Sequence, residues 1–244
     1  MLFFVRMLGA NGKPAPESRR GLPSPMVAFY KMMGLCSRFP QHRSFGHYYM
    51  GYLPWDKPAK IEVVSGAFCM IRREALLKVG LLDEDFFMYG EDIDLSYRIL
   101  KGGYQNYYLP VDILHYKGES TQKSSFRYVH VFYEAMLIFF RKHYSGMSHL
   151  LSIPVKFAIY ARASVAFTQM MTAKIRKSLG FFSPSHVDLS NQVLFDADEM
   201  SYEEMLHQLA QRSDENIKLA TYTKVIGKVI TDREVMDKDE FGYL

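Results

Sequence analysis

Two apolar runs in the first half of the chain predict β-strands. Residues 63–73 are mostly bulky and apolar, which predicts a buried strand. Ser65 and Gly66 interrupt this run, and a glycine in a strand lets another backbone or a ligand approach closely. Residues 104–109 predict a second strand, which Pro110 is expected to break. Strands of this kind, separated by helical segments, indicate an α/β fold.

Apolar residues at helical spacing predict helices between and after these strands. A short helix is expected over residues 74–79, because Gly80 follows as a stop signal. A longer helix is expected to begin at the acids around Glu91 and to end at Gly102. Within residues 124–144, aromatic and apolar side chains recur at roughly helical spacing, which is typical of a helix whose apolar stripe packs into a core.

The chain changes character after residue 150. A second long helix is predicted over residues 150–179, where basic residues interrupt the apolar ones. The basic charges exclude a clean membrane span and leave two interpretations: a helix that lies in the membrane surface, or one that packs on the protein with its basic face in solvent. Ser201, with Glu204 three positions later, predicts a capping box at a helix start. The tail is expected to form strand 193–195, helix 201–211, strand 217–222 and a further strand at 224–231.

Three acids at the start of the second helix are the strongest chemical signal in the chain. Glu91, Asp92 and Asp94 follow an aromatic run and Gly90. A carboxylate there meets the partial positive charge of a helix N-terminus, stays ionised near neutral pH and can take a proton from a substrate hydroxyl. The alternative is that these acids are ordinary helix caps. Asp94 is expected to pair with Arg98, four positions later on the same helix.

The order of these features resembles the family 2 glycosyltransferases, in particular the rhamnosyltransferase-like branch that builds bacterial surface polysaccharides. The resemblance covers roughly residues 1–145 and rests on Ser65-Gly66-Ala67, the run 79–95, Leu109-Pro110, His115 and the run 118–121. It implies transfer of a sugar, with inversion, from a nucleotide-diphosphate sugar to an acceptor hydroxyl. It places the catalytic base on Asp92, with Glu91 beside it to orient or cap.

The resemblance also implies that part of the fold is missing. These enzymes have a GT-A fold whose N-terminal half binds the nucleotide and carries an acidic signature for the metal. Before Asp56 this chain has a single acid, Glu17. We therefore expect an incomplete GT-A-like catalytic domain (its C-terminal half) over residues 1–145, long helices with an amphipathic segment over 146–182, and a small α/β tail over 183–244. The alternative is a non-catalytic acceptor-binding or scaffolding remnant that lacks the nucleotide-binding half.

The resemblance suggests further site residues. Ser65, Gly66, Trp55 and Arg20 are candidates for substrate binding, and His115 for a divalent metal, Mg²⁺ or Mn²⁺, in the intact enzyme. Arg20, with its neighbour Arg19, either contacts donor phosphates or belongs to a solvated surface pair. Trp55 either stacks on a sugar ring or is a half-buried anchor. The implied partners are the nucleotide-diphosphate sugar, a lipid-linked or glycan acceptor, and a separate N-terminal half.

Composition narrows the remaining possibilities. The 244 residues carry a formal charge of +4, which is too weak to indicate nucleic-acid binding. Cys36 and Cys69 lack metal or redox spacing and indicate reduced thiols of a cytoplasmic protein, with Cys69 in a core strand. The apolar stretch at the N-terminus is too short for a signal peptide. We expect a cytoplasmic location at the inner face of the membrane, where a lipid-linked acceptor would lie.

Overall fold

The computed structural model describes residues 2–115, 126–144, 191–232 and 234–242, together with 160, 164, 167, 168, 171, 172 and 175. The chain forms two compact units. The first contains Met1–Val5, Pro16–Pro110 and Thr121–Phe182, and the second contains Arg6–Ala15, Val111–Ser120 and Ser183–Leu244. Each unit is described by itself below.

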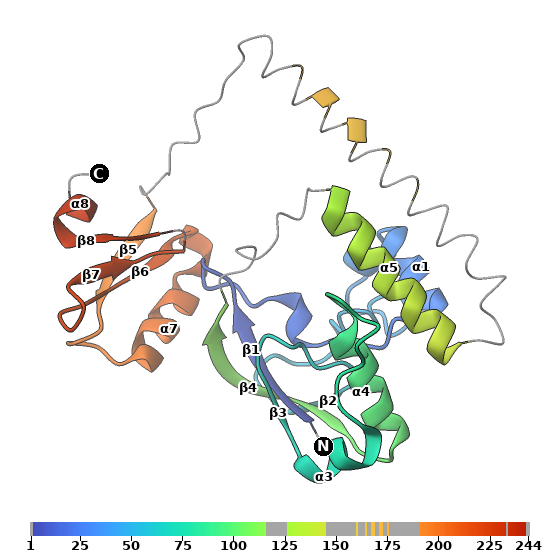
Figure 1. Ribbon diagram of the computed structural model, residues 1–244. Coiled ribbons are helices and arrows are strands. Elements are labelled where there is room, and N and C mark those ends of the chain that lie inside the picture. The colour runs from blue at the N-terminus through green and yellow to red at the C-terminus, as the bar shows by residue number, and fades with distance from the viewer. Residues whose placement is uncertain are drawn as a thin grey trace. The chain divides into compact units, whose positions relative to one another are not determined.

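The first sheet has four strands in the order β2 (Ala59–Ile61), β4 (Asn106–Leu114), β1 (Leu2–Leu8) and β3 (Cys69–Ile71) (Figure 1). The pairs β2–β4 and β1–β3 are antiparallel. The pair β1–β4 is parallel, because Leu2 N donates to Gln105 O at one end and His115 N donates to Leu8 O at the other. β1 is apolar at nearly every position and buried over most of its length, as expected of a strand covered on both faces.

Two strand predictions need correction. The strand expected over residues 63–73 is limited to β3, because the chain turns at Gly66 and Ala67 and only Cys69–Ile71 beyond that turn pair with β1. Cys69 is therefore exposed on a three-residue strand at the sheet edge and not in a core strand.

The expected break at Pro110 is also wrong, because β4 continues through it to Leu114. Only Asn106, Tyr107 and Tyr108 of β4 pair with β2. Pro110 lies beyond them, where a missing N–H need not remove a bond to that neighbour.

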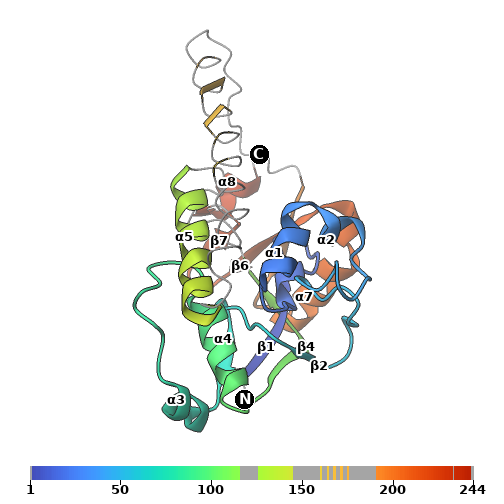
Figure 2. The ribbon, with the colours of Figure 1, turned by 90° about the vertical axis from the view of Figure 1, so that its right-hand side faces the viewer.

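Five helices accompany this sheet: α1 (Pro25–Met32), α2 (Leu35–Arg38), α3 (Arg73–Val79), α4 (Glu91–Lys101) and α5 (Phe126–His143). The predicted stop at Gly80 is confirmed, and this residue has φ +87° as the C-cap of α3. Figures 1 and 2 both show α5 beside α4. Their contact is an apolar cluster made of Val63, Phe86, Ile93, Ala135, Met136, Phe139 and Phe140. This cluster fixes the start of α4 against a long neighbouring helix.

The second unit contains β5 (Gln192–Asp196), α7 (Tyr202–Gln211), β6 (Lys218–Thr223), β7 (Lys228–Ile230), β8 (Val235–Asp237) and α8 (Lys238–Gly242). β5 and β6 are parallel, and the β6–β7 and β7–β8 pairs are antiparallel. The predicted strand–helix–strand unit is confirmed, as is the capping box of Ser201 and Glu204. The tail shares this unit with two earlier segments, since Leu219 N donates to Ala10 O and Leu114 packs on its core.

The helix predicted over residues 150–179 lies largely outside the described residues. The seven residues described there are helical and exposed, among them Tyr160, Phe167, Met171 and Ile175. No helix in the described part of the chain is both long enough and apolar enough to span a membrane.

Candidate active site

A left-handed turn lies directly before the acids at the start of α4. Tyr89 has φ +66° and Gly90 has φ +88°. A Cβ on Gly90 would lie 3.0 Å from Phe86 Cδ1 and 3.2 Å from the Ala135 Cβ. Glycine is therefore required by both the backbone conformation and the space. Gly90 is the N-cap residue of α4 and has no side chain to cap it. The helix itself begins with Glu91.

Asp94 is a buried structural hub. It accepts a hydrogen bond from Arg98 Nε at 2.7 Å, which confirms the predicted pair, and its other oxygen lies 2.6 Å from His143 Nε2 at the end of α5. Arg98 also donates to the carbonyls of Val79 and Leu81, at 2.7 Å each. Asp94 thus ties α4 to α5 and to the loop after α3.

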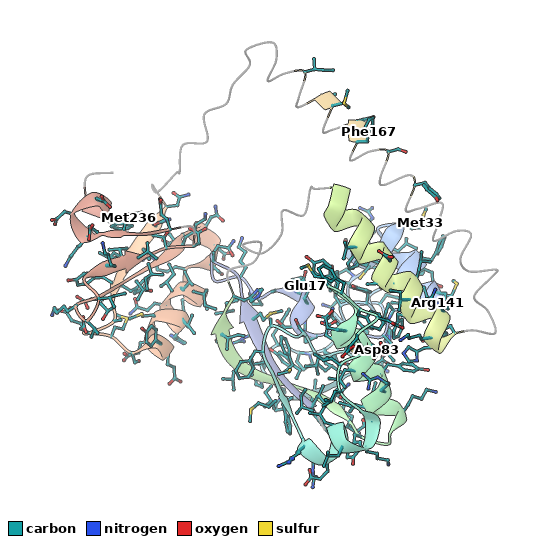
Figure 3. All side chains as sticks on the ribbon, in the orientation of Figure 1. Glu17, Met33, Asp83, Arg141, Phe167 and Met236 are labelled. Atoms are coloured by element: carbon teal, nitrogen blue, oxygen red, sulfur yellow. The ribbon has the colours of Figure 1, made fainter. Side chains whose placement is uncertain are left out.

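The last turn of α5 also holds the loop that precedes the acids. Lys142 Nζ lies 2.6 Å from Asp85 Oδ2 and also forms an ion pair with Asp83, which is labelled in Figure 3. The Asp83 ion pair lowers the pKa of that carboxyl, chiefly through its hydrogen bond with Lys142. The segment 83–94 is therefore fastened to α5 near both of its ends.

Asp92 lies between Arg20 and the loop that carries Ser65 and Gly66. Its Oδ2 forms an ion pair with Arg20 Nη2 and accepts a weaker hydrogen bond from Gly66 N at 3.4 Å. Within the described ranges, no hydrogen bond reaches Oδ1 of this carboxylate. The Asp92 side chain is 16% exposed. One carboxylate oxygen is thus held by the protein while the other is unoccupied.

Glu91 lies next to Asp92 but in a different environment. Burial raises the pKa of Glu91, and the neighbouring charge of Asp92 adds to that rise. Its Oε2 atom is buried and has no hydrogen-bond partner in the described part of the chain. A Cβ built on Gly66 would lie 4.0 Å from both Glu91 Oε1 and Asp92 Cβ. The structure therefore gathers four predicted site residues, Arg20, Gly66, Glu91 and Asp92, in one place.

Ser65 has a local role. Its Oγ accepts a hydrogen bond from Ala67 N at 3.4 Å, within the turn that precedes β3. This contact shapes the loop beside Asp92. A direct contact of Ser65 with substrate stays a prediction.

Two polar residues that sequence reasoning missed hold the frame behind the site. Ser96 Oγ accepts from Val64 N at 3.0 Å, and Asn106 Nδ2 donates to Glu62 O at 2.7 Å. Both side chains are fully buried. Nothing in the sequence distinguishes either residue from a polar residue at the surface.

Arg19 and Trp55 form a separate buried contact. The Arg19 guanidinium lies 3.5 Å from the centre of the Trp55 ring, and Tyr108 donates to the Trp55 carbonyl at 2.8 Å. Arg19 is 2% exposed and the Arg20 side chain 12%, so the solvated surface pair is wrong. Because Arg19 covers one ring face, the structure favours the half-buried anchor for Trp55. Sugar stacking on it stays untested.

Glu62 and His47 form a second ionisable pair that the sequence did not suggest. Glu62 Oε2 accepts from Leu22 N at 2.6 Å and lies 3.0 Å from His47 Nε2, while Tyr52 lies 2.9 Å from the other ring nitrogen. The hydrogen bond to Glu62 raises the pKa of His47 against the opposing effect of burial. Burial would raise the pKa of Glu62, but the bonds from His47 and Leu22 lower it. The pair fastens the segment around Tyr52 beside residue 22.

His115 belongs to the second unit, where its backbone N–H donates to Leu8 O at 2.9 Å. In the part of the chain that the structure describes, no group of three or more His, Cys, Asp or Glu side chains is placed to hold a metal ion. The metal-binding role of His115 stays a prediction.

The sequence has curated relatives. Over 126 residues, it is 29% identical to the N-acetylglucosaminyl-diphospho-decaprenol L-rhamnosyltransferases of two Mycobacterium tuberculosis strains, CDC 1551 / Oshkosh and ATCC 25618 / H37Rv. The match covers 51% of this chain and 39% of each relative, so the chain spans about two fifths of the length of these relatives. No solved structure matches the chain. Residues 39–202 match the model of the glycosyl transferase family group 2, and the chain therefore belongs to that family.

Proposed function

We propose that the chain carries the acceptor side of an inverting glycosyltransferase active site, in which Asp92 is the catalytic base. The observation that supports this most directly is the geometry of Asp92. Arg20 and Gly66 occupy one of its oxygens, and Oδ1 takes no hydrogen bond from the described residues. Family membership supplies the reaction class, transfer of a sugar.

The proposed step moves one proton and exchanges one bond. Asp92 Oδ1 accepts the proton of an acceptor hydroxyl while that oxygen attacks the anomeric carbon of the sugar. The bond between this carbon and the nucleotide diphosphate breaks, and its electron pair leaves with the diphosphate oxygen. Attack opposite the leaving group inverts the anomeric centre. Glu91 borders the same space and orients the acceptor.

The proposed substrates are a nucleotide-diphosphate sugar and a lipid-linked or glycan acceptor in bacterial surface polysaccharide synthesis. The curated relatives support this assignment, because their name specifies L-rhamnose as the sugar and a decaprenol-linked acceptor. We propose a deoxyhexose such as rhamnose as the transferred sugar. A lipid-linked acceptor also agrees with a location at the inner face of the membrane.

Mg²⁺ or Mn²⁺ would neutralise the diphosphate leaving group when bound. The described residues do not fit a complete site for either ion, since no three potential ligands converge. We propose that His115 supplies one imidazole ligand to such an ion in the intact enzyme.

We propose that the isolated chain does not turn over and that a nucleotide-binding half must complete it. The observation behind this proposal is that Glu17 is the single acid before Asp56, so the acidic signature expected for the diphosphate and its metal is missing there. Sugar transfer is measured in two preparations. One is the purified chain alone, and the other is the membrane fraction of cells that produce the chain, where a nucleotide-binding half can be present. Robust transfer by the purified chain alone would contradict the requirement, and the absence of transfer in both preparations would favour the non-catalytic remnant.

The role of Asp92 is tested by Asp92→Asn, which preserves shape and removes basicity. Transfer, measured in membranes of cells that produce the variant together with the nucleotide-binding half, should fall by roughly 10²–10⁴-fold, the usual contribution of a general base. Asp56→Asn is the matched control, because Asp56 is an exposed aspartate of the same unit. Near-normal transfer by Asp92→Asn together with an inactive Glu91→Gln would move the base to Glu91.

A further inference from the structure

We propose that Arg20 is a positioning residue, whose guanidinium holds Asp92 Oδ2 so that Oδ1 is presented to the acceptor hydroxyl. The inference rests on the proposed role of Asp92 as base and adds the group that orients it. In this proposal, positioning of Asp92 replaces the donor-phosphate contact suggested by the sequence.

The backbone of Arg20 is fixed independently of its side chain. Arg20 pairs with Val63 in an isolated antiparallel bridge, and its carbonyl accepts from Glu62 N at 3.1 Å and Val63 N at 2.9 Å. Val64, which follows the bridge partner Val63, donates its N–H to Ser96 Oγ on α4 at 3.0 Å. Arg20 and the helix that carries Asp92 are therefore attached to one rigid frame.

The Arg20 guanidinium forms its hydrogen bonds with groups of this same frame. Nη2 donates to Asp92 Oδ2 and also lies 3.4 Å from the Val64 carbonyl. Nε is buried and has no partner within the described ranges, so it is not directed to solvent. A buried guanidinium without a counter-charge would be strongly unfavourable, which keeps the carboxylate beside it. Burial by itself would lower the pKa of Arg20. The charge of Asp92 is the main opposing cause, and the pKa is raised overall.

The two oxygens of Asp92 are therefore not equivalent. Two donors from different segments, Arg20 Nη2 and Gly66 N, meet at Oδ2 and restrict rotation of the carboxylate. Oδ1 is left for a substrate. A base restrained in this way needs no reorganisation before it accepts a proton. Without Arg20, the weaker 3.4 Å contact with Gly66 is the one hydrogen bond from the described residues that would still orient the carboxylate.

The test measures the order of Asp92 about its Cα–Cβ bond, which must also be restrained if Arg20 holds Oδ2 in place. NMR relaxation of a 13C-labelled Asp92 methylene is recorded in the full chain, its Arg20→Lys variant and its Arg20→Gln variant. We expect the order parameter to fall on going from the parent chain to Arg20→Gln, to below about 0.6, the range of flexible groups. Arg20→Lys should lie between them, because an ammonium keeps the charge but lacks the planar fork. Arg72→Gln is the control, since Arg72 pairs with Glu74 on the surface.

Backbone amides of α4 report in the same spectra whether each variant is folded. A folded Arg20→Gln variant with Asp92 as ordered as in the parent chain would overturn the proposal and leave Arg20 a purely structural role. If Arg20→Gln does not fold, Arg20→Lys decides in its place, and unchanged order there has the same consequence. Full transfer activity in Asp92→Asn would instead refute the proposed base, while the effect of Arg20 on Asp92 order would remain.

Discussion

Asp94 gives the sharpest stability prediction, because its side chain is buried and its two oxygens contact Arg98 and His143. Replacement by Asn keeps the volume of the side chain but removes its charge. One amide oxygen can still accept a bond from Arg98 or His143, while the amide NH₂ then faces a second donor. The substitution therefore loses one charge-assisted bond and leaves the Arg98 guanidinium without its counter-ion.

The expected cost is about 3 kcal/mol. A hydrogen bond to a charged group contributes about 1.5–3 kcal/mol, and breaking a buried ion pair costs about 3–5 kcal/mol. The lower end applies because the Arg98 side chain is 21% exposed and can recover some hydration. This loss is a large part of the roughly 5–15 kcal/mol by which domains are stable.

Trp55 provides the assay. It is the sole tryptophan of the chain and lies in the same unit as Asp94, so its fluorescence follows unfolding of that unit. With a urea dependence of about 2 kcal/mol per M, Asp94→Asn should lower the urea midpoint by about 1.5 M. Asp56→Asn, at an exposed site, should leave the midpoint unchanged. A loss below about 1 kcal/mol in Asp94→Asn would refute the buried hub as we describe it.

Three further predictions test other parts of the structure. Gly90→Ala should destabilise the first unit by about 1–3 kcal/mol, because φ +88° and the 3.0 Å approach to Phe86 both oppose a Cβ; Gly103→Ala, also at positive φ but with open space around it, is the control for conformation alone and should cost less in the same urea titration. The raised pKa of His47 adds stability that is fully present below its ordinary value of 6.5 and is lost as the pH rises through the folded-state value; His47→Gln should remove this decline from a series of urea titrations across that range, and an unchanged pH dependence would argue against the Glu62–His47 pair. The helix predicted over residues 150–179 should bind anionic liposomes peripherally through its apolar and basic residues, as co-sedimentation would show, whereas equal recovery in the supernatant with and without anionic lipid would favour a helix packed on the protein.

Local sequence signals located most of the elements and the acids of the candidate site. The acids at the start of α4 and the Asp94–Arg98 pair follow from spacing within one helix, where neighbours three or four positions apart must meet. Gly80 and the Ser201–Glu204 box also act over a few residues. The resemblance to family 2 glycosyltransferases rested on the same local run, and the family match over residues 39–202 confirms it.

Errors arose where a residue's environment depends on distant partners. Cys69 reads as a core residue from its apolar neighbours, yet it is exposed because a turn leaves β3 at the sheet edge. Pro110 reads as a strand break, yet β4 continues because its β2 neighbour has already ended. Arg19 reads as a surface charge, yet it is buried against Trp55.

The sequence by itself determined the position of the acidic helix and of the glycine before it, because both depend on short-range geometry. Tertiary structure decided which partners each acid meets. Asp92 meets Arg20, 72 positions away, and Asp94 meets His143, 49 positions away. Both encounters follow from one strand-like bridge and one helix–helix contact. Three neighbouring carboxylates of similar intrinsic chemistry thus acquire different roles from the charges and burial that distant segments bring to them.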